Sequence, residues 1–104
     1  MRLPLTLLDC AEADIAHAVS WYDRQVPGLG DSFYSHVART LDAIEQFPAS
    51  YQQDFGMVRR AITHRFPFAV YYRILTDTVQ VVAILGCHLD PSAIRSRLTD
   101  EPRH

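Results

Sequence analysis

The stretch from Val58 to Ile74, VRRAITHRFPFAVYYRI, sets four arginines and one histidine among apolar residues and contains no acidic residue. Valine, isoleucine, phenylalanine and tyrosine favour β-strands, so the stretch predicts two strands that meet near Phe66-Pro67. Neighbouring residues of a strand point to opposite faces, so these arginines cannot form a single basic patch. Four alternate residues, which point to the same side of the first strand, are expected to form its solvated face: Arg59, Ala61, Thr63 and Arg65.

The segments after this stretch extend the predicted sheet. Tyr71 and Tyr72 must point to opposite faces, so we expect one of them in the core. Residues 79–87, VQVVAILGC, are apolar at both parities, which is typical of a central strand covered on both faces. Asp77-Thr78 fits a tight turn before this strand, so the second half reads as an antiparallel meander.

The chain then closes with a short helix. Pro91 suits a first helical position, and this helix carries Arg95 and Arg97. Residues 99–104 are expected to form a frayed tail.

The first half predicts a helical hairpin behind one short strand. Residues 2–8 read as a strand in which Pro4 marks an edge or a strand start. We expect a first helix capped by Asp9, with Glu12 at capping-box spacing, that ends near Gln25. A second helix is expected to begin at Asp31 or Ser32 and to stop before Pro48, followed by a loop over residues 49–56. The apolar stripes of the two helices are expected to form the core: Ile15, Val19, Tyr22, Phe33, Val37, Leu41 and Ile44.

This order of elements, β-α-α-β-β-β with a short C-terminal helix, predicts one α+β domain over residues 1–104, with the helices packed on a mainly antiparallel sheet. The 104 residues contain 48% hydrophobic residues, a normal share for a single globular core. No apolar run is long enough to span a membrane, so we expect a cytoplasmic protein without membrane contact. Cys10 and Cys87 are far apart and the histidines lack zinc-site spacing, so no metal site is expected.

Charge argues against direct nucleic-acid binding. The net charge is −2, and every basic side chain except histidine is arginine. Residues 1–54 carry eight acids and three arginines, whereas residues 55–104 carry four acids and seven arginines. A chain that binds nucleic acid by electrostatics normally has a strong basic excess. The arginine forks of the second half also suit carboxylates, as on an acidic partner protein.

In this order and spacing, four segments resemble the RelE/ParE family of toxins from type II toxin–antitoxin systems, and the ParE-like plasmid-stabilisation branch in particular. The segments are DIAHAVSWYDRQVPGLGDSFYSHV (14–37), FPASY (47–51), VRRAITHRFPFAVYYRI (58–74) and AILGCHLDPSAIRSR (83–97). The resemblance covers the chain from about Leu5 to Arg97. It implies the RelE/ParE-like fold, growth inhibition, and a cognate antitoxin that binds the toxin in a hetero-oligomer without a cofactor.

The resemblance leaves three activities open. ParE-like members act on a protein target, DNA gyrase, without catalysis, whereas RelE-like members cleave ribosome-bound messenger RNA without a metal. A third alternative is a non-toxic member that only binds its antitoxin. It arises because Gly86, His88 and Leu89 stand where the family commonly carries a histidine and basic residues before the Asp90-Pro91 step.

The candidate site residues follow from these alternatives. A nuclease would need cations around the phosphate and an acid–base pair, for which the candidates are Arg60, Arg65, Tyr72, Arg73 and His88. A surface for a target protein or an antitoxin would draw on Trp21, Arg59, Arg60, Arg65, Arg73, Arg95 and Arg97. Structural roles stand beside these. Arg59 and Arg65 can simply be solvated, Arg60 can pair with an acid of the helices, and His64 and His88 can be structural. Trp21 can cover the hairpin loop or contact a partner.

Overall fold

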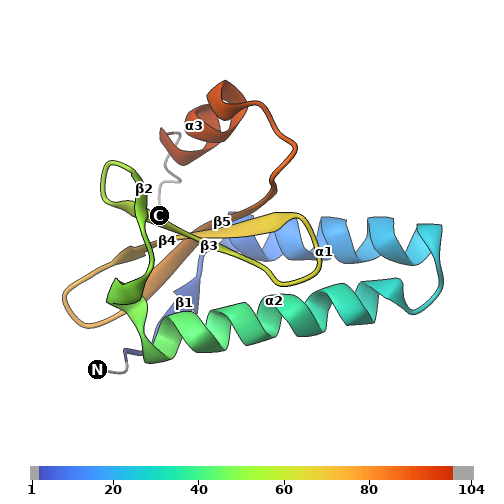
Figure 1. Ribbon diagram of the computed structural model, residues 1–104, viewed down its shortest axis with the longest axis horizontal. Helices are drawn as coiled ribbons and strands as arrows, with labels where there is room; N and C mark the ends of the chain where they lie inside the picture. Colours follow the sequence, from blue (N-terminus) through green and yellow to red (C-terminus); the bar gives the residue numbers. More distant parts are fainter. Residues whose placement is uncertain (1–2, 100–104) are drawn as a thin grey trace.

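The computed structural model describes residues 3–99, which form a five-stranded sheet and three α-helices (Figure 1). The elements in chain order are β1 (Leu5–Leu7), α1 (Asp9–Gln25), α2 (Leu29–Gln46), the 3-10 turn η1 (Pro48–Ser50), β2 (Gln53–Phe55), β3 (Val58–Ile62), β4 (Phe68–Ile74), β5 (Val79–Gly86) and α3 (Pro91–Thr99). The strand order is β1-β5-β4-β3-β2. Only β1 pairs in parallel, with β5, and the other pairs are antiparallel. The predicted α+β architecture, with β5 inside the sheet and Pro91 opening α3, is therefore confirmed.

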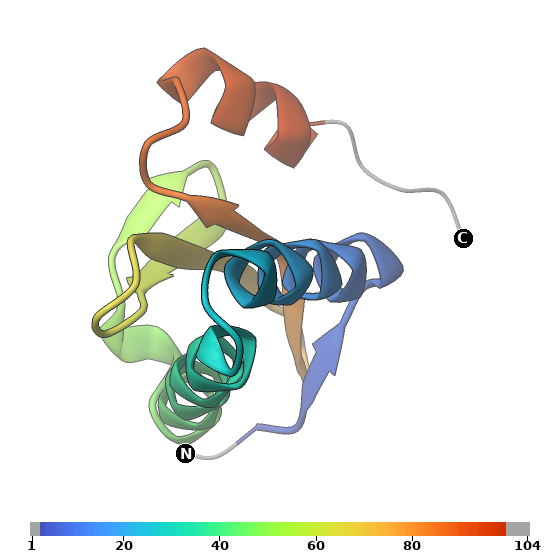
Figure 2. The same cartoon turned by 90° about the vertical axis from the view of Figure 1, so that its right-hand side faces the viewer.

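The helices cover the sheet on both faces (Figure 2). The hairpin of α1 and α2 packs on one face, around a core cluster that includes Phe33, Val37, Ile44 and Tyr72. The short helix α3 lies on the other face, where Leu98 joins a second cluster with Tyr71. The register of β4 on β5 shifts between these two tyrosines. Both tyrosines are buried, one in each cluster, whereas we expected only one of them in the core.

A close approach of the two helices fixes the hairpin. A side chain at Gly30 would bring its Cβ within 2.6 Å of the Val19 carbonyl oxygen, so only glycine fits there. The Gly30 N–H donates to the Asp23 carboxylate at 2.8 Å. The predicted stripes pack as expected: Phe33, Val37 and Ile44 are fully buried, and the other four residues pack against them.

The predicted helix starts were wrong. Asp9 lies in the first turn of α1, whose N-cap is Leu8, and no side chain caps the helix. Helix α2 begins at Leu29, before the predicted Asp31, because Gly28 takes a left-handed conformation with φ of 89°. Only that conformation lets the chain reverse within so few residues, and the preference of acids for N-caps does not reveal it. Both helices still carry acids in their first turns, where the helix dipole favours them.

Two further corrections concern the sheet. The predicted loop over residues 49–56 overlaps η1, which begins at Pro48, and contains the edge strand β2, in which Gln53 and Asp54 are exposed and only Phe55 is apolar. The prediction of which side chains of β3 face solvent was also wrong. Ala61, which was expected to be solvated, is buried under the hairpin, whereas Ile62 is 58% exposed. Val58, of the same parity as Ile62, is buried in the cluster that contains Leu98. A strand whose cover changes along its length shows no simple alternation.

At the start of the described chain, the expectation for the first strand is confirmed. Strand β1 starts directly after Pro4 and lies at the edge of the sheet. Thr99 is the last residue of α3, and the rest of the predicted frayed tail, 100–104, lies outside the described residues. Within residues 3–99, no helix has the length and apolar character needed to cross a membrane.

Candidate binding sites

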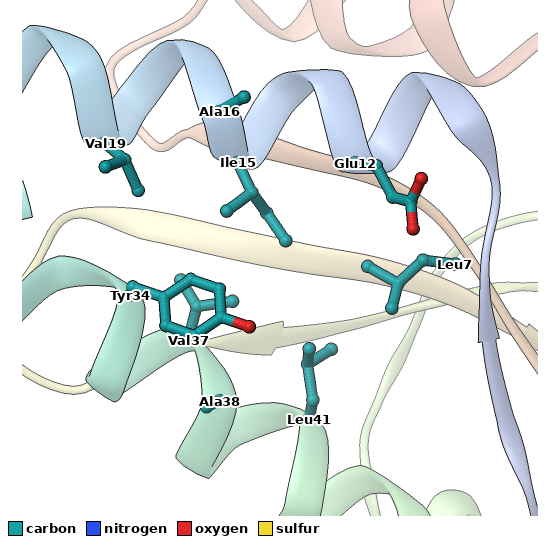
Figure 3. Close-up of a pocket in the computed structure, with 9 residues that line it drawn as sticks. All are labelled: Leu7, Glu12, Ile15, Ala16, Val19, Tyr34, Val37, Ala38 and Leu41. Carbon is teal, nitrogen blue, oxygen red and sulfur yellow. The ribbon is translucent and has the colours of Figure 1, made fainter. Parts of the chain in front are cut away.

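The outer side of the helical hairpin holds an apolar groove with a volume of about 400 Å3 (Figure 3). Its walls come from α1 and α2, and Leu7 of β1 lies at one end beside Glu12. Glu12 is the only charged residue that the described part of the chain contributes to the lining, and the Tyr34 side chain is 56% exposed. The lining residues are Leu7, Glu12, Ile15, Ala16, Val19, Tyr34, Val37, Ala38 and Leu41. An apolar segment that carries one basic group near Glu12 would fit this groove.

A second cavity, of about 240 Å3, lies between α3 and the sheet and has a different chemistry. Arg60 of β3 and Arg95 of α3 both line it, together with Asp54, Tyr71 and Cys87. Arg60 faces Tyr71 across the β3–β4 register, and its guanidinium charge acts to lower the pKa of the phenol. Arg95 is additionally held over the Phe55 ring, 5.2 Å from its centroid. The structure therefore brings together two of the predicted arginines on the face covered by α3.

The electrostatics of this cavity favour anion binding. Burial raises the pKa of the Tyr71 phenol, and the neighbouring Arg60 only partly opposes that rise, so Tyr71 stays neutral and can donate a hydrogen bond. Two guanidiniums against the single carboxylate of Asp54 give the lining one net positive charge, which suits one carboxylate or phosphate group. Among the described residues, 3–99, no histidine lines the cavity, so this part of the chain supplies no side chain there that ordinarily titrates near neutral pH.

Two candidates from the sequence serve inside the fold. Tyr72 is fully buried, and its hydroxyl donates to the Pro48 carbonyl oxygen at 2.6 Å. Burial raises the pKa of Tyr72 to about 12. Arg59 donates to the carbonyl oxygens of Tyr51, at 2.6 Å, and Ala49, at 3.3 Å, and so ties the segment after α2 to β3. Tyr72 therefore cannot contact RNA, and Arg59 is already bound to the backbone.

Arg97 joins three elements. Its guanidinium makes a two-pronged contact with the Asp14 carboxylate of α1, at 2.7 and 3.0 Å, which raises the pKa of Arg97. The same carboxylate accepts the N–H of Ile84, which lies on β5 beyond the end of its pairing with β1. Arg97 also donates to the Cys10 carbonyl oxygen at 3.3 Å. Asp14 thus closes an open sheet edge and anchors α3 at the same time.

The remaining candidates lie apart from the cavity under α3. Arg73 donates to Gln80 at 2.6 Å, across β4 and β5. Arg65 is exposed, has a φ of 78°, and its guanidinium lies 5.9 Å from the centroid of the Phe66 ring. Trp21 and His88 line a third pocket beside Pro67. The proposed nuclease set, Arg60, Arg65, Tyr72, Arg73 and His88, is therefore not assembled in one place.

Sequence reasoning missed several residues of these sites. Tyr71, Asp54 and Cys87 join Arg60 through the strand register and the cover of α3, neither of which is visible in the sequence. For the groove, a signal was present: Glu12 and Ala16 are four residues apart, as are Tyr34 and Ala38, so each pair shares a helix face. Within residues 3–99, no three His, Cys, Asp or Glu side chains group in a way that could hold a metal ion.

Comparison with known proteins places this fold. No family model matches the chain, and no curated protein matches it. Among solved structures, a chain of the "Chromosomal ParDE TA system from P. aeruginosa", where TA denotes toxin–antitoxin, superposes with a TM-score of 0.74. The alignment covers 82% of this chain and 96% of that chain, at 17% sequence identity. The fold is ParE-like. The groove thus lies on the helical hairpin of a ParE-like fold, and the arginine cavity lies between its sheet and its C-terminal helix.

Proposed function

We propose that this chain is the toxin of a type II toxin–antitoxin pair, that it acts in the cytoplasm by binding a protein target, and that a cognate antitoxin neutralises it. The observation that carries the proposal is the ParE-like fold shared with a chain of a ParDE system. The groove of about 400 Å3 on the hairpin adds support, because a partner helix or extended segment can bury apolar side chains there. DNA gyrase is the candidate target.

The two sites suit different parts of the partners. The hairpin groove takes an apolar antitoxin segment with a basic group near Glu12. The cavity with Arg60 and Arg95 takes a carboxylate from the target or from an acidic antitoxin tail. Charged contacts of this kind mainly set the association rate and the choice of partner, whereas the apolar groove supplies most of the affinity.

Messenger RNA cleavage is supported less well. The Tyr72 phenol is buried and bound to the Pro48 carbonyl, and no histidine of the described part of the chain lines the cavity with Arg60. Cleavage by the 2′-hydroxyl needs an acid and a base beside the cations. An anion-binding cavity without such a pair supports docking better than catalysis.

The first experiment is induction of the chain alone in a bacterial host. We expect arrested growth with filamentation and DNA-damage signalling, and purified protein should block supercoiling by gyrase. Co-expression of a small DNA-binding protein from the neighbouring reading frame should restore growth. Immediate arrest of translation with cut messages would replace this proposal with the nuclease, and normal growth would replace it with the non-toxic member.

A matched pair of variants then tests the groove. Ala38→Arg places a long side chain in the groove, whereas Ala13→Arg adds the same charge on an exposed position of α1 outside it. We expect Ala38→Arg to weaken antitoxin binding by about 100-fold, while Ala13→Arg leaves it nearly unchanged. Binding is measured by calorimetry with the purified antitoxin. Equal affinities of the two variants would place the antitoxin elsewhere.

A further inference from the structure

The third pocket shares no residue with the hairpin groove or with the cavity under α3. It has a volume of about 450 Å3 and lies between the second half of α1, the residues that lead into β4, and His88 just beyond β5. Its lining is Ala18, Trp21, Tyr22, Pro67, Phe68 and His88. Three of the six are aromatic and none is an acid or an arginine.

The aromatic wall is held in place although half of Trp21 is open to solvent. The Trp21 side chain is 50% exposed, yet its ring meets Tyr22 edge-on, with centroids 5.1 Å apart and planes at 84°. Tyr22 packs in turn on Phe33 and Phe66, at 5.2 and 5.0 Å. A large exposed ring that is already fixed in position loses little conformational entropy when a partner covers it.

The imidazole wall depends on a glycine. A Cβ at Gly86 would lie 2.5 Å from Cε1 and 2.6 Å from Nδ1 of His88, so the ring occupies space that any side chain at position 86 would need. The imidazole gives the pocket a polar group that can donate or accept one hydrogen bond. Gly86 and His88, which the sequence marked only as departures from a family pattern, therefore act together to shape this wall.

The chemistry of the lining favours a ligand with a flat aromatic ring, which enters the pocket, and a negatively charged group, which stays outside it. Aromatic rings pack favourably edge-on or offset against Trp, Tyr and Phe. The loop that supplies Pro67 also carries His64 and Arg65, both exposed, and no acid occurs between residues 55 and 76. Outside residues 3–99 the printed sequence has no Trp, Tyr or Phe that could fill the pocket from within.

We propose that this pocket receives one aromatic side chain, flanked by an acidic residue, from the protein partner of this chain. The proposal rests on the proposed function in taking that partner to be a protein. A polynucleotide is disfavoured, because it carries a negative charge on every nucleotide and the chain has a net charge of −2, whereas a single carboxylate needs only one cation, such as Arg65 of the loop that supplies Pro67. Exposed tryptophans at the centre of pockets are typical anchors of protein interfaces.

Trp21 is the only tryptophan of the chain, so its fluorescence reports directly on the pocket. The probe is the acetylated, amidated tripeptide Asp-Phe-Glu, which does not absorb where indole is excited. We expect a saturable change of the Trp21 emission with this peptide, none with Asp-Ala-Glu, and a weaker one with Lys-Phe-Lys. Equal responses to all three peptides, or no response to any, would overturn the proposal, and so would tighter binding of adenosine monophosphate.

Variants of Gly86 and His88 test whether the imidazole wall of the pocket contributes to binding. Gly86→Ala should push the His88 ring aside and weaken Asp-Phe-Glu about tenfold, and His88→Ala, which leaves the backbone unhindered, should do the same. Phe47→Ala is the control, because Phe47 is 62% exposed and does not line the pocket. Circular dichroism confirms that each variant is folded. If folded His88→Ala bound Asp-Phe-Glu with unchanged affinity, the imidazole would not be part of the site, and the proposal would be contradicted.

The Trp21→Ala variant separates this proposal from the proposed function. We expect it to lose growth inhibition while the purified variant still binds the antitoxin. If the unmodified chain inhibits growth but Trp21→Ala inhibits it equally, the pocket proposal fails and the toxin proposal stands. If the unmodified chain has no effect on growth although Asp-Phe-Glu binds, the toxin proposal fails and the pocket remains.

Discussion

At the scale of the residue, the two adjacent tyrosines of β4 point to opposite faces of the sheet and therefore have different roles. The Tyr72 hydroxyl donates to the Pro48 carbonyl oxygen at 2.6 Å and so fixes the segment that follows α2. Tyr71 instead meets Arg60 on the opposite face of the sheet, at the edge of a cavity. One phenol is bonded inside the fold and the other borders a cavity, although both are buried and both have a raised pKa.

Tyr72 predicts loss of stability at alkaline pH. Burial raises its pKa from 10.0 to about 12, so the folded state retains a proton that the unfolded chain releases. A raised folded-state pKa means that the stabilisation is complete below pH 10 and is lost as the pH rises toward 12. The loss is up to about 1.4 kcal/mol per pH unit for each such group. Urea unfolding at several pH values between 9 and 12 measures it.

Tyr72→Phe is the control for the decrease of the free energy of unfolding with pH. At neutral pH it should cost about 1 kcal/mol, because the Pro48 carbonyl loses its donor. Above pH 10 its stability should fall less steeply than that of the unmodified chain. The contributions of Tyr71 and Tyr22, whose pKa values burial also raises, remain in both proteins. An identical slope in the variant would show that Tyr72 does not ionise in this range.

At the scale of the element, α3 is held to the rest of the fold by contacts at its middle and near its end. At its middle, Arg95 stacks over Phe55 of β2. Near its end, Leu98 is buried and Arg97 is tied to Asp14 of α1. Because α3 forms one wall of the arginine cavity, these contacts also set how open that cavity is. The helix is only nine residues long and would not be stable without such anchors.

The Asp14–Arg97 contact predicts unequal costs for its two partners. Arg97→Gln should cost about 1 kcal/mol and increase amide exchange in α3. Asp14→Ala should cost more, about 2–3 kcal/mol, because it also leaves the Ile84 N–H without its acceptor and Arg97 without its carboxylate. Urea unfolding gives the free energies, and hydrogen exchange shows where the structure loosens. Equal costs would mean that the Ile84 contact contributes nothing.

At the scale of the whole molecule, the first strand closes the fold. Strand β1 pairs with β5, more than 70 residues away along the chain. The Val79 N–H donates to the Pro4 carbonyl at 2.8 Å, and the Leu3 N–H donates to the Glu45 carbonyl at 3.2 Å. The N-terminal segment thus joins the sheet to the end of α2, and Leu7 forms part of the hairpin groove.

Deletion of the chain through Leu7 should therefore cost on the order of 4 kcal/mol, from lost backbone hydrogen bonds and from the exposed apolar surface that Leu5 and Leu7 cover. That is a large part of the 5–15 kcal/mol typical of domains of this size. Thermal unfolding and calorimetry measure the loss. Thr6→Ala, at an exposed position of the same strand, is the control and should change stability by less than about 0.5 kcal/mol. A deleted chain as stable as the full one would contradict a closing role for β1.

The sequence by itself determined the element types and their order, because apolar periodicity and turn residues act over a few neighbours. It predicted the core stripes of both helices, the edge position of β1 and the start of α3 at Pro91. It did not reveal β2 or the exposed parity of β3, since both depend on what covers the sheet.

Only the tertiary structure decided which side chains meet. The strand register set Arg60 against Tyr71, and the path of the chain after β5 placed the His88 ring over Gly86. The packing of α3 directed Arg97 inward to Asp14 and left Arg95 at the cavity. Sequence patterns count arginines and assign them to faces of a strand. Whether each arginine meets a carbonyl, a carboxylate or solvent depends on contacts between residues up to 87 positions apart, and local periodicity carries no information about those contacts.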